Sequence, residues 1–128
     1  MALRPRAESV GFIAEYASHL RVERGLAENS LIAYGHDLSR LAAYAGERRK
    51  HVLDLRQRDL TDFIARLREG GLSARSAARA VHAVRGLYRF AVREGRIEAD
   101  PMENLKAPRS FTALPRYLTS LFAAAASC

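Results

Sequence analysis

Cysteine is almost absent from this 128-residue chain, whose single one, Cys128, is the last residue. A lone cysteine excludes an intrachain disulfide and a metal cluster held by thiolates. Long apolar runs are also missing, since the longest, residues 121–126, is far too short to span a bilayer. The first residues carry charges at Arg4, Arg6 and Glu8 with no apolar run behind them, so we expect no signal peptide. These absences predict a soluble, cytoplasmic protein that does not associate with a membrane.

Acidic residues are scarce in the part of the chain where basic ones are dense. The chain has 21 lysines and arginines against 14 acids, a formal net charge of +7, and arginine supplies 19 of those 21. Between Arg66 and Arg96 there are eight arginines but only two acids, Glu69 and Glu94. An excess of this kind indicates a polyanionic partner, and the guanidinium fork suits phosphates and guanine edges.

Strand signals are missing as well, and the pattern of apolar residues is helical throughout. The first predicted helix has Ser9 as its N-cap and ends before Gly25. The second opens at Glu28 and ends near Gly46, and the charged loop that follows is expected to be solvated.

The third and fourth predicted helices complete the domain. The third covers residues 57–69, and the fourth begins after an N-cap at Ser73 and ends before Gly95. A short turn is expected near residues 101–104, and the segment from Leu105 onward reads as an extended linker because prolines interrupt it. The fold class is therefore all-α, a compact four-helix bundle with an extended C-terminal tail.

The fourth predicted helix is two-faced. At 100° per residue its apolar residues gather on one side and five arginines gather on the other, with no acid among them: Arg75, Arg79, Arg85, Arg89 and Arg93. We call these five residues the arginine stripe. A solvated helix face usually mixes both signs, so an acid-free face favours duplex DNA, with a basic surface or an acidic protein partner as alternatives. A helix-turn-helix regulator is a further alternative, although its second helix is normally shorter.

The arginines of the stripe are expected to be exposed. Replacing Arg75, Arg79 or Arg93 by alanine should therefore hardly change thermal stability.

Two long segments resemble a known family. They are "YASHLRVERGLAENSLIAYGHDLSRLAAYAG", residues 16–46, and "GLSARSAARAVHAVRGLYRFAVREGRIEADPMENLKAPR", residues 71–109. Together with the residues between them they resemble the N-terminal core-binding, SAM-like domain of Xer-type tyrosine recombinases and phage integrases. The resemblance covers about residues 9 to 109, and "ALPRYLT" after it looks like the opening of that family's catalytic domain.

The resemblance implies a domain division and a set of site residues. Residues 1–106 would form the DNA-binding core-binding domain, and residues 107–128 the linker and the start of a catalytic domain. In the family the second and fourth helices face the major groove of duplex DNA. Carried over by position, the DNA-binding residues are Ser30, Ser73, Arg75, Ser76 and Arg79, with His82 and Arg85 as weaker members. The implied partners are double-stranded DNA and, in a full-length protein, the other recombinase subunits of a synaptic tetramer.

The chemistry of the family resides in the catalytic domain, where a tyrosine nucleophile forms a 3′-phosphotyrosyl intermediate beside arginines, a lysine and a His-x-x-Arg element. His82 and Arg85 match that spacing, but they lie mid-helix in the DNA-binding half, and we interpret the match as coincidence. We expect this chain to hold no catalytic residue, cofactor or metal. Chromosome-dimer resolution and DNA integration are both compatible with the resemblance.

Overall fold

The chain folds into four long helices and one short 3-10 turn in a computed structural model that describes residues 3–105, with side chains from residue 8 onward. The elements are α1 (Leu3–Val22), α2 (Glu28–Glu47), η1 (Val52–Asp54), α3 (Gln57–Glu69) and α4 (Ala74–Arg93). The described residues contain no strand, and the predicted all-α, four-helix architecture is confirmed. None of the helices in this part of the chain is long and apolar enough to cross a membrane.

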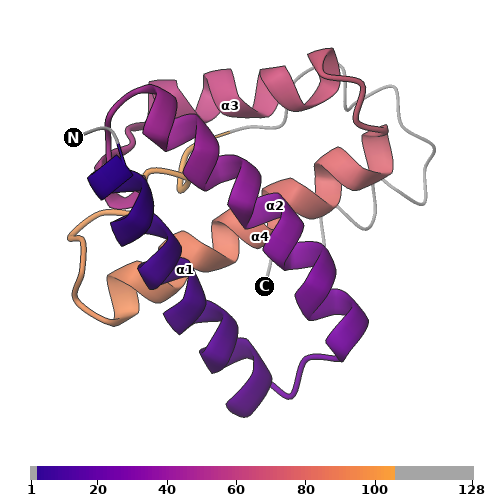
Figure 1. The fold of residues 1–128 in the computed structure, drawn as a ribbon, viewed down its shortest axis with the longest axis vertical. Helices are drawn as coiled ribbons and strands as arrows, with labels where there is room; N and C mark the ends of the chain where they lie inside the picture. The colour runs from indigo at the N-terminus through magenta and orange to yellow at the C-terminus, as the bar shows by residue number, and fades with distance from the viewer. Residues whose placement is uncertain (1–2, 106–128) are drawn as a thin grey trace.

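The helices are arranged around α4 (Figure 1). α1 and α2 lie beside each other as a hairpin, α4 runs across both of them, and α3 lies along one end of the domain. The apolar face of α4 is buried among all three, and its central residues Val84, Leu87 and Tyr88 are fully enclosed. α1 comes so close to α4 at Gly86 that a Cβ there would clash with the Tyr16 hydroxyl. The fourth helix is therefore the central element of the core, and only its opposite face can contact solvent or a partner.

The predicted boundaries of α3 and α4 are confirmed, because local signals define them. Ser73 caps α4 by accepting a hydrogen bond from the Ser76 amide at 3.1 Å. At the start of α3 the Asp59 carboxylate accepts from the Arg56 amide at 2.9 Å, half of a capping box. The turn at residues 101–104 is also confirmed, with Met102 buried. The tail and the domain division at residues 106 and 107 lie outside the described residues, so they stay predictions.

Two expectations about the first half of the chain are wrong. Ser9 does not cap α1, which begins at Leu3; its side chain is buried, and its hydroxyl oxygen accepts a hydrogen bond from the Val52 amide at 3.0 Å. The hydroxyl oxygen that the local pattern predicts as a helix cap is therefore bonded to a donor distant in the sequence, the Val52 amide. The loop after α2 is docked on α3 instead of being solvated, because Arg48 donates to Asp62 at 2.8 Å and Lys50 to Asp59 at 3.3 Å.

Candidate nucleic-acid interface

The start of α4 carries a cation that forms no ion pair with a described residue. Arg75 is the second residue of the helix and is exposed, and it makes no hydrogen bond or ion pair with any residue in the described part of the chain. It lies in the same turn as Ser73 and Ser76, whose capping bond fixes the geometry of the helix start. The first amides of a helix and its positive dipole end favour an anion, and the charge of Arg75 adds to that positive potential.

One turn further along, Arg79 is paired with an acid from another helix. Its Nε donates to Asp37 Oδ2 at 2.8 Å and its Nη2 donates to Asp37 Oδ1 at 2.9 Å, which makes a bidentate contact between α4 and α2. The Asp37 side chain is 0% exposed and that of Arg79 is 38% exposed. Hydrogen bonding to Asp37 raises the pKa of Arg79 above its usual value. The expectation that Arg79 is a freely exposed cation is therefore wrong, although its helix face contains no acid of its own.

His82 lies where α4 crosses α2, against the edge of Tyr34 with the ring centroids 6.0 Å apart. Its Nδ1 is buried and has no hydrogen-bond partner among the described residues. Burial lowers the pKa of His82, and three nearby arginines lower it further: Arg89, Arg24 and Arg85. His82 is consequently neutral near pH 7 and sits within a concentration of positive charge drawn from α4 and from the loop between α1 and α2.

The far half of the stripe faces acidic residues. Arg85 is half-buried and donates to the backbone carbonyls of Leu105 at 2.9 Å and Met102 at 3.5 Å, and its burial lowers its pKa. Together with Arg89 and Arg93 it lines a cavity of about 650 Å³ that three acids also line: Glu98, Asp100 and Glu103. The fold therefore supplies counter-charge to this half of the stripe from the segment that follows the helix.

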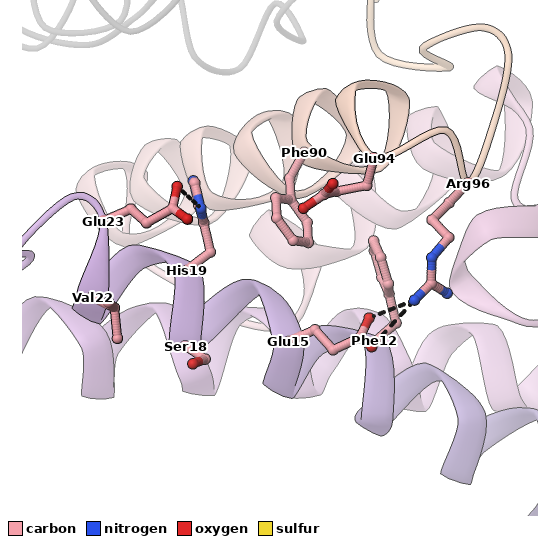
Figure 2. Close-up of a pocket in the computed structure, with 9 residues that line it drawn as sticks. All are labelled: Phe12, Glu15, Ser18, His19, Val22, Glu23, Phe90, Glu94 and Arg96. Carbon is pink, nitrogen blue, oxygen red and sulfur yellow. Dashed lines mark hydrogen bonds and ion pairs between the residues drawn. The ribbon is translucent and has the colours of Figure 1, made fainter.

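Arg93 is also committed to a neighbour. Its Nη2 lies 2.9 Å from His19 Nε2. Figure 2 shows the other contact of this ring, in which His19 Nδ1 lies 3.1 Å from Glu23. The tautomer in which Nε2 accepts and Nδ1 donates is compatible with both contacts. This histidine lines a second cavity of about 560 Å³ between α1 and the end of α4, and the ion pair of Arg96 with Glu15 at 2.9 Å closes its rim. The basic groups of that cavity are thus already paired with carboxylates or rings.

On α2, the predicted residue Ser30 is half-buried in the first turn and makes no hydrogen bond through its side chain to the described residues. The structure connects α2 to α4 one and two turns later, through Tyr34 and Asp37. Sequence reasoning missed Asp37 and Arg24. Asp37 could have been noticed, because it follows Tyr34 by three residues and precedes Leu41 by four, on the apolar stripe of the helix. Arg24 gave no such signal, since a loop residue has no periodicity.

The fold and this surface together define a class: an all-α domain built around one long basic helix whose first turn exposes an arginine. The chain belongs to the family of phage integrase N-terminal SAM-like domains, whose sequence profile matches residues 13–95. The resemblance inferred from the sequence is confirmed at that level.

The similar curated proteins are recombinases. The chain is 42% identical over 106 residues to the tyrosine recombinase XerC of Pseudomonas putida, an alignment that covers 80% of this chain and 35% of that protein. It is 43% identical over 106 residues to XerC of Pseudomonas aeruginosa, covering 80% and 34%. It is 41% identical over 114 residues to the tyrosine recombinase XerD of Mycobacterium tuberculosis, covering 81% and 36%. The chain thus spans about a third of the length of these relatives. No solved structure matches the chain significantly.

Proposed function

We propose that this chain binds duplex DNA with the start of α4 and the adjoining face of α2, as the N-terminal domain of a site-specific tyrosine recombinase. A 20-residue helix with one face free of acids has the length and charge to follow a major groove. The names of the similar proteins support a role in recombination, because they are tyrosine recombinases. Catalysis, and assembly with other recombinase subunits, would belong to the complete protein.

The observation that carries this proposal is the position of Arg75. It is exposed at the start of α4, beside the Ser73 cap, and no described residue neutralises it. Several other cations of the domain have acidic partners, as Arg48 has in Asp62 and Arg96 has in Glu15. An unpaired cation at a helix N-terminus is a position that a phosphate or a guanine edge can occupy.

The chain offers a matched control on another helix. Arg58 is the second residue of α3, just as Arg75 is the second residue of α4, and it too is exposed and without a partner in the described residues. Both substitutions therefore remove the same charge from the same helical position. They differ in the helix on which the charge lies and in its first turn, which contains Asp59 in α3 and no acid in α4.

The test is a fluorescence-anisotropy titration of a labelled duplex with the 128-residue chain at fixed salt. Arg75→Ala should weaken binding by about 1–3 kcal/mol if a base edge is contacted, whereas Arg58→Ala should cost under about 0.5 kcal/mol. Equal losses would leave only a nonspecific basic surface. A polyglutamate competitor that displaces the duplex at equal charge concentration would favour the alternative of an acidic protein partner.

A further inference from the structure

Asp37 is the acid that lies deepest beneath the stripe. Its side chain is fully buried on α2, and both carboxylate oxygens accept hydrogen bonds from Arg79 on α4. A second cation, Arg40, approaches Asp37 Oδ1 at 3.4 Å from the solvent side, with 45% of its side chain exposed. The phenol of Tyr34 is also nearby, and its pKa is raised by burial and by Asp37. No other titratable group in residues 8–105 forms a hydrogen bond or an ion pair with this carboxylate.

The bidentate contact with Asp37 uses only some of the N–H donors of the Arg79 guanidinium. A guanidinium has five N–H donors, and Asp37 accepts from Nε and Nη2. The remaining donors, including both on Nη1, are not bonded to any described residue, and 38% of the side chain reaches solvent. Arg79 is therefore held in one orientation while it keeps donors to offer outward.

The same contact cancels the charge of Arg79. A guanidinium and a carboxylate at 2.8 Å form a neutral pair, and a phosphate approaching Arg79 meets the field of Asp37 as well. Arg75, one turn earlier, has no such partner among the described residues. Two arginines on one helix face, four residues apart, are thus electrostatically different.

From this geometry we propose that Asp37 is a positioning residue for DNA recognition: it neutralises and orients Arg79, so that Arg79 supplies a directional hydrogen-bond contact and Arg75 supplies the salt-dependent attraction. The inference rests on the proposed binding of duplex DNA. In this arrangement Asp37 occupies the place on Arg79 that a phosphate would otherwise take. The neutral pair therefore lowers nonspecific affinity for the phosphate backbone of DNA, while the free N–H donors of Arg79 face the duplex.

Salt dependence separates the two roles, because each phosphate neutralised by a cation contributes a slope of about −0.9 to the plot of log K against log salt. Arg75→Gln should make the slope of the wild-type chain shallower by about 0.9. Arg79→Lys keeps the charge pair with Asp37 but loses the planar fork, so the slope should stay unchanged while affinity falls by the same factor at every salt concentration. The double variant Asp37→Asn/Arg79→Gln replaces the ion pair by a neutral amide pair, and it too should keep the wild-type slope.

Asp37→Asn alone releases Arg79 as an ordinary cation. It should steepen the slope by up to about 0.9 and raise affinity for a duplex of unrelated sequence. Melting temperatures of all variants accompany the titrations. If Asp37→Asn does not fold, Arg79→Lys and the double variant still decide the matter, because both keep a paired contact between the two helices.

Three results would overturn the inference. The first is a double variant whose slope becomes as shallow as that of Arg75→Gln, since Arg79 would then be a common phosphate contact. The second is Arg79→Lys and the double variant both binding like the wild type, which would leave the pair with a structural role only. The third is a folded Asp37→Asn chain with an unchanged slope. Failure of the wild-type chain to bind any duplex is a different outcome, because it rejects the proposed function itself.

Discussion

The two ends of α4 carry the same kind of residue in different electrostatic surroundings. At the start, Arg75 is exposed and no described residue neutralises it. Toward the other end, Arg93 contacts His19 and lines a cavity together with Glu98, Asp100 and Glu103. A stripe of arginines along one helix is therefore not one uniform surface. What each residue can offer to a polyanion depends on the segments that fold against it. Under the proposed function, this difference favours the start of the helix as the DNA-facing end.

The largest expected effect concerns stability at the start of the helix. Arg79→Ala leaves the buried Asp37 carboxylate with only the longer contact to Arg40. Breaking a fully buried pair costs about 3–5 kcal/mol, and solvent around the 38% exposed Arg79 side chain should reduce the loss to about 2–3 kcal/mol. The free energy of unfolding from urea denaturation measures it.

Arg75→Ala is the control for that measurement, with an expected change below about 0.5 kcal/mol. The expectation from sequence that Arg79 contributes little to folding is replaced by this one, because its guanidinium is now known to be paired. If Arg79→Ala melts like Arg75→Ala, the ion pair does not hold α2 against α4.

A second comparison uses the two ends of the stripe directly. Arg75→Ala should weaken binding to a duplex at fixed salt by about 1–3 kcal/mol, whereas Arg93→Ala should cost under about 0.5 kcal/mol. The reason is that Arg93 already contacts His19 and lies near three acids, so its charge adds little at the surface. Anisotropy titrations of the two variants give the answer, and a greater loss at Arg93 would move the interface to the far end of α4.

The smallest effect expected is a pH dependence at the crossing of α4 with α2. Because the pKa of His82 is lowered in the folded chain, the unfolded chain takes up the proton first as the pH falls below about 6.5. The contribution of neutral His82 to stability is thus complete above that pH and is lost on acidification. Urea midpoints between pH 7.5 and 5.5 should fall more steeply for the wild type than for His82→Gln.

The exposed His36 on α2 provides the control for that experiment. His36→Gln should leave the slope of the wild type unchanged. The pKa values of Asp59 and Asp62 are lowered by hydrogen bonds to the Arg56 amide and to Tyr44, so these carboxyls titrate below the pH window and do not disturb it. A wild-type slope equal to that of His82→Gln would mean that the histidine is hydrated in the folded chain.

Whether a contact could be predicted from the sequence depended on how far apart its two residues lie along the chain. The Ser73 cap and the limits of α3 follow from residues within one helical turn, and these predictions are confirmed. Ser9 carries the same local signal as Ser73, but its partner, the Val52 amide, is 43 residues away, and no local pattern contains that information. Likewise a helical wheel describes one helix, so it could not reveal that Asp37, 42 residues before Arg79, neutralises part of the stripe.

The contacts of Val52 have a consequence for the way the domain opens. Its amide donates to Ser9 of α1 at 3.0 Å, and its carbonyl accepts from the Tyr88 hydroxyl of α4 at 2.6 Å, with all three residues buried. A short turn between helices usually exchanges its amide protons quickly, through local fluctuations. Here the Val52 amide cannot meet water unless α1 separates from this turn, so its exchange should be much slower than that of an open turn. In hydrogen exchange, the Val52 amide between α2 and α3 should therefore behave like an amide in the middle of a helix.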